Sequence, residues 1–252
     1  MHKKKIMKNI FNFSGGKTSA YMVIHYWKPG DLVIFTDTGR EHPKTYKFIH
    51  DFEAFENIPV IKISYKDSDN PFDEMLAKRK HKQLPNRMKR ICTVELKIRT
   101  CKRYLKSIGI IRFNNIIGFR YDEELRVKRH VEKYKKVKTI FPLYENKIDK
   151  AIINNFWNKK NYNLEIPSIL GNCTLCFMKG KNAIINILST YPELAKEWIK
   201  DEEIAQQHGK HGGHTYFPDI TYKQLLSIAQ NNLFKDIDLN NISSAYNCSC
   251  TP

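Results

Sequence analysis

Two adjacent glycines stand between an apolar segment and a helical pattern near the start of the sequence. Phe11–Ser19 reads FNFSGGKTS. Glycine lets successive backbone N–H groups turn toward one ligand, and the N-terminus of a helix adds a partial positive charge. Hydroxyl groups and a lysine flank the glycines and can contact the same anion. The segment therefore predicts a phosphate-binding loop rather than an ordinary glycine turn, and its members are Ser14, Gly15, Gly16, Lys17, Thr18 and Ser19.

Six cysteines form three groups along the chain: Cys92 with Cys101, Cys173 with Cys176, and Cys248 with Cys250. The Cys173-x-x-Cys176 spacing suits a zinc pair, a redox dithiol or iron–sulfur ligands. One such pair does not complete a metal site, but Cys92 and the C-terminal pair can supply further thiolates. Cys101 falls within a helical pattern, and we expect it to be a small buried residue. Four thiolates of this kind suit a 4Fe-4S cluster, with structural zinc as the alternative.

Charged residues follow two further apolar segments. Asp37 comes directly after DLVIFT and can bind Mg²⁺ or a nucleotide hydroxyl, or it can form the turn before Gly39. Arg120 and Arg126 follow Gly118, and two guanidinium groups can clamp a phosphate or sulfate. The alternative for both arginines is a solvated charged helix, because three acidic residues lie between them. We expect Arg120 to contact the anion, and Arg126 is the weaker candidate.

Short apolar runs alternate with helical patterns through the first half of the chain. Strands are expected at 8–13, 31–36, 59–64 and 114–118, and helices at 17–27, 42–56 and 93–108. This alternation predicts βαβ units, and hence an α/β fold with a doubly wound, mostly parallel sheet. Ligands in such sheets bind beyond the C-terminal ends of the strands, where the phosphate loop, Asp37 and Arg120 fall.

The pattern changes after residue 145. Helical patterns dominate the second part, at 147–158, 183–188, 192–206 and 221–231, and its loops carry cysteine and glycine. We therefore predict a nucleotide-binding α/β domain over residues 1–145. A helical, cysteine-containing C-terminal extension over residues 146–252 is expected to pack on it.

The composition is strongly basic. The 252-residue chain has 43 Lys and Arg against 26 Asp and Glu, which gives a formal net charge of +17. Such an excess attracts polyanions, so nucleic acid is a candidate partner beside phosphorylated small molecules. No run approaches the roughly 18 apolar residues that cross a bilayer, and the basic N-terminus lacks the apolar stretch of a signal peptide. We expect a cytoplasmic protein that does not enter a membrane.

Six ordered segments carry a family resemblance: Ser14–Ser19, Phe35–His42, Arg90–Lys97, Gly118–Arg126, Gly171–Gly180 and Cys248–Thr251. Ser14–Ser19 is similar to the PP-loop of ATP pyrophosphatases, Ser-Gly-Gly-x-Asp-Ser, with Thr18 in place of the aspartate. Together the segments resemble the phage-type branch of the phosphoadenosine phosphosulfate (PAPS) reductase family. The resemblance covers nearly the whole chain.

The resemblance implies an adenine nucleotide alpha hydrolase-like fold that binds PAPS or ATP. The residues that it places at the nucleotide are Ser14–Ser19, Asp37, Thr38, Gly39, Gly118 and Arg126. It also implies a 4Fe-4S cluster, whose ligands would be Cys92, Cys173, Cys176 and either Cys250 or Cys248. In the reductase reaction, Arg120 would help to hold the sulfonate, and Cys248 or Cys250 would attack its sulfur.

Two other functions remain open. Relatives that make sulfite carry a catalytic cysteine in a Glu-Cys-Gly-x-His context, which this sequence lacks. The first alternative is an ATP-dependent nucleic-acid sulfurtransferase. In that enzyme ATP, with Mg²⁺, adenylates a base oxygen and releases pyrophosphate, and sulfur bound to cysteine or a cluster then replaces the oxygen. The second alternative is a non-catalytic nucleotide or redox sensor, which the fold alone does not exclude.

Overall fold

The computed structural model describes residues 7–79, 83–134, 137–208 and 213–231. At its centre lies a parallel sheet of five strands in the order β3-β2-β1-β4-β5. The strands are β1 (Lys8–Phe13), β2 (Leu32–Asp37), β3 (Val60–Ser64), β4 (Phe113–Ile116) and β5 (Thr139–Ile140). The predicted α/β fold with a doubly wound parallel sheet is confirmed. Four strands coincide with their expected positions to within two residues at either end, and the short β5 is an addition.

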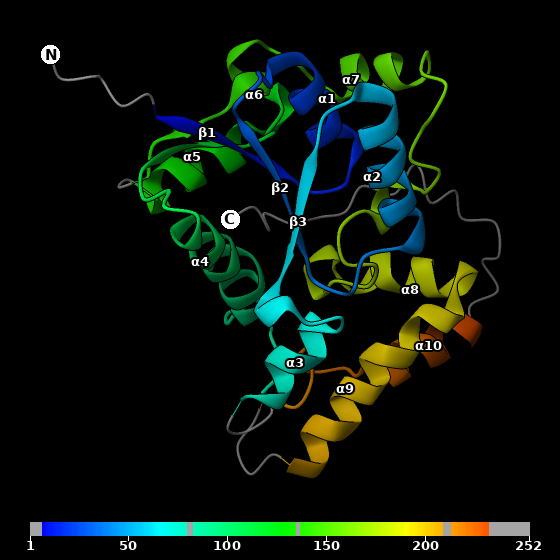
Figure 1. The fold of residues 1–252 in the computed structure, drawn as a ribbon. Coiled ribbons are helices and arrows are strands. Elements are labelled where there is room, and N and C mark those ends of the chain that lie inside the picture. The colour runs from blue at the N-terminus through cyan, green and yellow to red at the C-terminus, as the bar shows by residue number, and fades with distance from the viewer. Residues whose placement is uncertain (1–6, 80–82, 135–136, 209–212, 232–252) are drawn as a thin grey trace, which may run out of the picture.

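Neighbouring strand residues point to opposite faces of the sheet, and each face is covered by its own helices (Figure 1). Phe11 and Phe35 pack against α1 and α2 on one face. Ile10 and Ile34 pack against α4 on the other. Because both faces are buried, the strands are nearly continuous apolar runs, which explains why the sequence pattern located them. The helix bounds are α1 (Lys17–Tyr26), α2 (Pro43–Glu56) and α4 (Thr100–Ser107).

A π-helix, Thr93–Arg99, precedes α4, where the sequence predicts one continuous helix over 93–108. The hydroxyl of Thr100 donates a hydrogen bond to the Glu95 carbonyl at 2.9 Å, next to this widened turn. Single π-turns are frequent at functional sites. The remaining helices are α3 (Pro71–Ala77), α5 (Glu124–Lys133), α6 (Pro142–Glu145), α7 (Lys150–Trp157), α8 (Lys181–Thr190), α9 (Ala195–His208) and α10 (Tyr222–Asn231).

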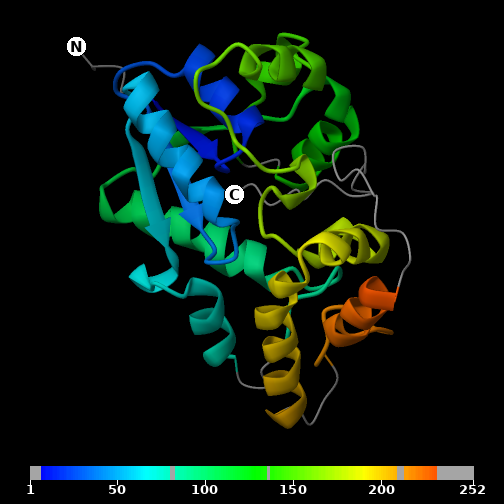
Figure 2. The ribbon, with the colours of Figure 1, turned by 90° about the vertical axis from the view of Figure 1, so that its right-hand side faces the viewer.

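Helices α8, α9 and α10 lie together beyond the ends of β2 and β3, next to α3 (Figures 1 and 2). The apolar core continues across residue 145. Trp157 packs with Phe48 in the cluster on the α1–α2 face, and Phe72 and Leu96 pack with residues of α8, α9 and α10. The boundary between residues 145 and 146 stays a prediction. In the described ranges, no helix has the length and apolar character to cross a bilayer.

Candidate functional site

The predicted phosphate loop connects β1 to α1 at the C-terminal edge of the sheet. Gly15 has a φ of +72°, and a Cβ atom there would lie 2.6 Å from Thr45 Cγ2. The turn therefore requires glycine. The Ser19 hydroxyl accepts a hydrogen bond from the Ser14 N–H at 3.1 Å and donates one to the Gly16 carbonyl at 2.9 Å. These contacts fix the shape of the loop.

The N-terminus of α1 is open to an anion. Gly16 is its N-cap, and no side chain forms a capping hydrogen bond there. The first turn contains Lys17 and Thr18 and has no acidic residue. The orphan N–H groups and the helix dipole favour negative charge here. Burial lowers the pKa of Lys17. The indole N–H of Trp157 donates to the Lys17 carbonyl at 2.9 Å, so α7 supports the loop from outside the sheet.

Asp37 ends β2, next to the phosphate loop. Its Oδ1 accepts hydrogen bonds from the Gly39 N–H at 2.7 Å and from the Tyr46 hydroxyl at 2.8 Å. The turn-forming role is therefore present, and contact with a nucleotide or Mg²⁺ stays a prediction. Gly39 has a φ of +72°, and a Cβ atom there would lie 2.9 Å from Pro71 Cδ. Glycine is thus required at this turn as well.

Arg120 and Arg126 lie beyond β4 and converge on one carboxylate. Both form ion pairs with Glu123, and Arg120 also pairs with Asp122 at 2.9 Å. The Arg126 guanidinium lies over the Phe119 ring, 4.2 Å from its centroid. Only 15% of the Arg120 side chain and 21% of the Arg126 side chain are exposed, so they do not form a solvated charged helix. Their contact with a bound anion stays a prediction.

Strand order places these residues at the same edge of the sheet. β2, β1 and β4 are neighbours in the sheet, and all three end at the same edge. The loop Ser14–Ser19 follows β1, Asp37–Gly39 closes β2, and Gly118 and Arg120 follow β4. In an open parallel sheet this edge is the usual place for a ligand. The structure therefore brings the predicted nucleotide residues to one edge.

Three cysteines gather near the same edge. Cys173 Sγ lies 3.3 Å from Thr38 Oγ1, directly after Asp37. Burial and the neighbouring thiols raise the pKa of Cys92 to about 11 and that of Cys173 to about 12, and they also raise the pKa of Cys176. The thiols are therefore close enough to affect one another's charge. Cys101 instead packs with the sheet and α4 as a small buried residue.

Buried charged residues for which the sequence pattern predicts no role surround the thiols. The Lys179 ammonium donates to the carbonyls of Cys173 at 2.8 Å and of Thr174 at 2.7 Å, and burial lowers its pKa to about 8. Lys97 and Glu41 are also buried and lie close enough to Cys173 to influence its pKa. Burial raises the pKa of Glu41. The sequence could have indicated these three charged residues, because each lies within a segment that resembles the family.

Three thiols supply donors of the kind that a thiolate-bound metal uses. Burial raises the pKa of Cys176, and the Met178 N–H and the Lys179 ammonium oppose this rise without cancelling it. Among the described residues, however, no three His, Cys, Asp or Glu side chains are arranged to hold a metal ion. The predicted further ligands, Cys248 and Cys250, lie outside the described residues. The 4Fe-4S cluster, with zinc as its alternative, stays a prediction.

Comparison with known proteins decides the family. The sequence profile of the phosphoadenosine phosphosulfate reductase domain matches residues 8–154, more than half of the chain. The chain belongs to this family. It is 26% identical over 258 aligned positions to ORF290, an uncharacterized nin region protein of Escherichia phage lambda; the match covers 88% of this chain and 83% of the phage protein. A structural match to the crystal structure of PAPS reductase from Candida auris, a phosphate complex, covers 62% of this chain and 76% of that chain. The two are 18% identical, and the TM-score is 0.43.

Proposed function

We propose that this member of the PAPS reductase family is an enzyme that binds an adenine nucleotide along Ser14–Ser19 and Asp37–Gly39 and carries out sulfur chemistry beside it. The observation that carries the proposal is the 3.3 Å approach of Thr38 Oγ1 to Cys173 Sγ. Thr38 directly follows the last residue of β2, so the nucleotide edge and the thiols adjoin. Proximity of this kind is the first requirement for a reaction between two groups.

In the PAPS version, the loop holds the nucleotide phosphates with Arg126, and Arg120 helps to hold the sulfonate. Cys248 or Cys250 attacks the sulfonate sulfur, the bond between that sulfur and the phosphate oxygen breaks, and adenosine 3′,5′-bisphosphate leaves. A second thiol then displaces sulfite from the first. The two thiols end as a disulfide, which an external thiol reductant must reduce before the next turnover.

A metal group would be held by Cys92, Cys173 and Cys176, with Cys250 or Cys248 as the further ligand. When bound, a 4Fe-4S cluster supplies electron transfer, and zinc supplies a structural cross-link. Lys97 and Lys179 add positive charge around these sulfurs, which favours the thiolate form that any such group needs.

The test is product formation by reduced protein that has been purified anaerobically. One sample receives PAPS and a thiol reductant, and another receives Mg-ATP with nucleic acid, and sulfite and pyrophosphate are assayed in both. Sulfite without pyrophosphate supports the PAPS version. If the protein binds nucleotide tightly but forms no sulfite, releases no pyrophosphate and transfers no sulfur, it is not an enzyme of this kind. That result favours a sensor.

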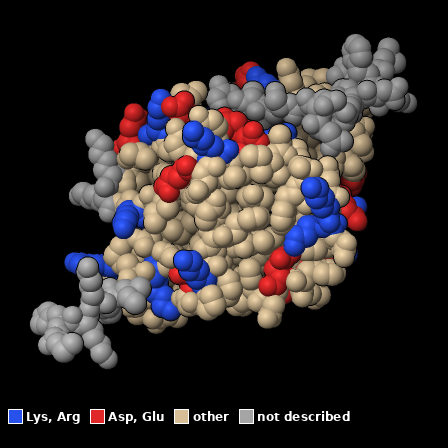
Figure 3. All heavy atoms as spheres, turned by 90° about the horizontal axis from the view of Figure 1, so that it is seen from above, with Lys and Arg blue, Asp and Glu red and all other residues tan. Residues whose placement is uncertain are grey.

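The net charge of +17 favours a second candidate, the ATP-dependent nucleic-acid sulfurtransferase. On the face shown in Figure 3, Lys and Arg are scattered among acidic residues around a largely uncharged centre, so this face offers no continuous basic patch. Pyrophosphate release that depends on added RNA or DNA would select this candidate. Its nucleic-acid affinity should also fall steeply as salt rises, because phosphate contacts release counterions.

A further inference from the structure

Arg40 lies in the short segment after β2 and contributes its main chain to the thiol site. Its carbonyl accepts a hydrogen bond from the Thr174 N–H at 3.0 Å, and the next residue, Glu41, forms an antiparallel bridge with Cys173. The Arg40 N–H donates to Thr38 Oγ1 at 3.4 Å. The Arg40 backbone is therefore part of the arrangement that places Cys173 beside Thr38.

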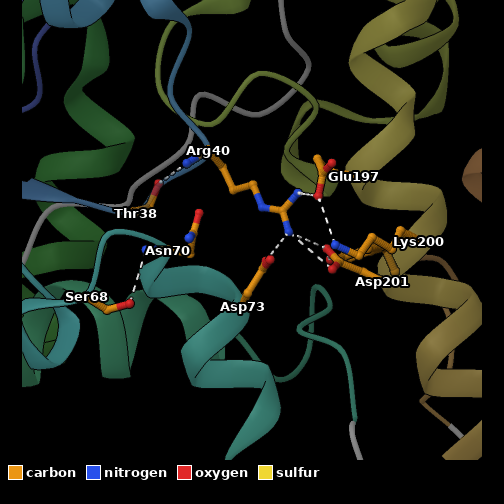
Figure 4. Close-up of polar contacts among 9 residues, drawn as sticks. Thr38, Arg40, Ser68, Asn70, Asp73, Glu197, Lys200 and Asp201 are labelled. Carbon is orange, nitrogen blue, oxygen red and sulfur yellow. Dashed lines mark hydrogen bonds and ion pairs between the residues drawn. The ribbon is translucent and has the colours of Figure 1, made fainter.

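The side chain of Arg40 extends toward α3 and α9 (Figure 4). Its Nη2 donates to Asp73 Oδ1 of α3 at 2.6 Å and to Asp201 Oδ2 of α9 at 3.0 Å. The guanidinium carbon lies 4.9 Å from the ring centroid of Phe72 and 5.8 Å from that of Trp198. Only 7% of the side chain is exposed. One buried guanidinium thus joins two helices from distant parts of the sequence.

Three further polar or charged side chains lie around this contact, and Arg40 Nη1 has no hydrogen-bond partner among the described residues. The Tyr216 hydroxyl donates to Asp201 Oδ2 at 2.7 Å, and Glu197 Oε2 lies 3.9 Å from Arg40 Nη1 and 3.7 Å from Lys200 Nζ. Burying an ion is unfavourable, and an apolar side chain of similar size would fill the space without desolvating a charge. The rigid planar guanidinium, however, fixes the relative position of its partners. The guanidinium therefore fixes the positions of α3 and α9 relative to the segment after β2.

We propose that Arg40 is a positioning residue through which α3 and α9 hold Cys173 at the end of β2. The side chain fixes the segment 38–41 against the two helices, and the main chain carries that position to Thr174 and Cys173. The proposal rests on the proposed function in one respect, since it takes the nucleotide edge and Cys173 to serve the same reaction. Nucleotide binding at Asp37–Gly39 should then change how strongly the backbone amides of residues 171–180 are protected from hydrogen exchange. This change should require the Arg40 guanidinium.

The first test is amide hydrogen exchange of the full chain without nucleotide, comparing the wild type with Arg40→Met, Arg40→Lys and a control. The control is Lys160→Met, which removes a partly buried ion pair with Glu56 outside this network. Exchange at the Thr174 amide should accelerate by about tenfold or more in Arg40→Met and by less in Arg40→Lys, which keeps the charge but not the planar fork. The rate in Lys160→Met should stay at the wild-type value. Equal rates in Arg40→Met and the wild type would overturn the proposal.

The second test repeats the exchange with Mg-ATP and with PAPS, each at saturation. When nucleotide occupies both proteins fully, the wild type should change the protection of its amide hydrogens over 171–180, whereas Arg40→Met should show no such change. A wild-type change that persists in Arg40→Met would overturn the proposal. If the wild type binds neither nucleotide, the proposed function fails, while the nucleotide-free comparison still decides the role of Arg40. If Arg40→Met does not fold, Arg40→Lys and Asp201→Asn carry both comparisons.

Discussion

The hydroxyl oxygen of Thr38 lies 3.3 Å from the sulfur of Cys173, although the two residues are 135 positions apart. The same hydroxyl donates to Glu41 Oε1 at 3.1 Å. Thr38 therefore connects the end of β2, where the nucleotide is proposed to bind, with the thiols. This contact is the reason for treating the phosphate edge and the cysteine group as parts of one site.

Thr38→Val should remove this connection while keeping the shape of the side chain. Because buried Glu41 loses a donor, the free energy of unfolding should fall by about 1–3 kcal/mol, which chemical denaturation measures. Sulfur-containing product should decrease more than nucleotide affinity does. The matched control is Thr45→Val, because Thr45 is equally buried and its hydroxyl has no hydrogen-bond partner among the described residues. A loss of stability in Thr45→Val equal to that in Thr38→Val would contradict the assignment.

Gly15→Ala should impair the phosphate loop. The new Cβ would meet Thr45 Cγ2 at 2.6 Å in a backbone conformation that L-residues rarely adopt, so the loop must shift. We expect a loss of about 1–3 kcal/mol of stability and of about tenfold or more in nucleotide affinity, measured by denaturation and calorimetry. Gly30→Ala is the control, since Gly30 has a φ of +99° with no atom within 4 Å of the added Cβ. Gly30→Ala should lower the free energy of unfolding and leave the nucleotide affinity unchanged.

Glu202→Gln should flatten the dependence of stability on pH. Burial raises the pKa of Glu202 from 4.5 to about 7, although the N–H groups of Tyr216 and Tyr222 donate to it. The folded chain then binds a proton more tightly than the unfolded chain. This tighter proton binding contributes a few kcal/mol to the free energy of unfolding. The contribution is complete below pH 4.5 and is lost as the pH rises through 7. Denaturation between pH 4.5 and 7 measures it, and exposed Glu165→Gln should keep the wild-type profile. A wild-type profile in Glu202→Gln would contradict the prediction.

Cys173→Ser should lower the metal content of anaerobically purified protein. If the thiols hold a 4Fe-4S cluster, iron and sulfide should fall well below the wild-type amounts, because a thiolate ligand is lost. Cys101→Ser provides the comparison, since Cys101 is buried between the sheet and α4 and belongs to a different cluster of residues. Stoichiometric zinc without iron in the wild type would rule out the cluster and leave a structural zinc site.

Four of the five strands and helices such as α1 and α2 were predictable because local signals are sufficient for them. β1 and β2 are apolar runs that end in glycine-containing loops, and in the second half α10 begins within one residue of the expected position. The phosphate loop was readable for the same reason, since Gly15 and Gly16 lie next to each other in the sequence. Their contacts depend only on the strand before them and the helix after them.

The charged network was not predictable from local patterns. Arg40 pairs with Asp201 across 161 positions, and that pairing depends on how α9 packs beyond the sheet. Glu41, Lys97 and Lys179 carry charges, which usually indicate exposed positions, and only the folded chain reveals that all three are buried. The available signal was that all three lie in segments that resemble the family, and that those of Lys97 and Lys179 also contain cysteines.

The central claim is that the nucleotide edge and Cys173 serve one sulfur reaction. Its most direct test compares nucleotide affinity and formation of sulfur-containing product in the wild type, Cys173→Ser and Cys101→Ser. We expect Cys173→Ser to bind PAPS or Mg-ATP with a Kd within about threefold of the wild type but to lose at least about 100-fold in product formation. Cys101→Ser should keep both properties. Product formation at the wild-type rate by Cys173→Ser would show that Cys173 takes no part in the reaction at the nucleotide edge.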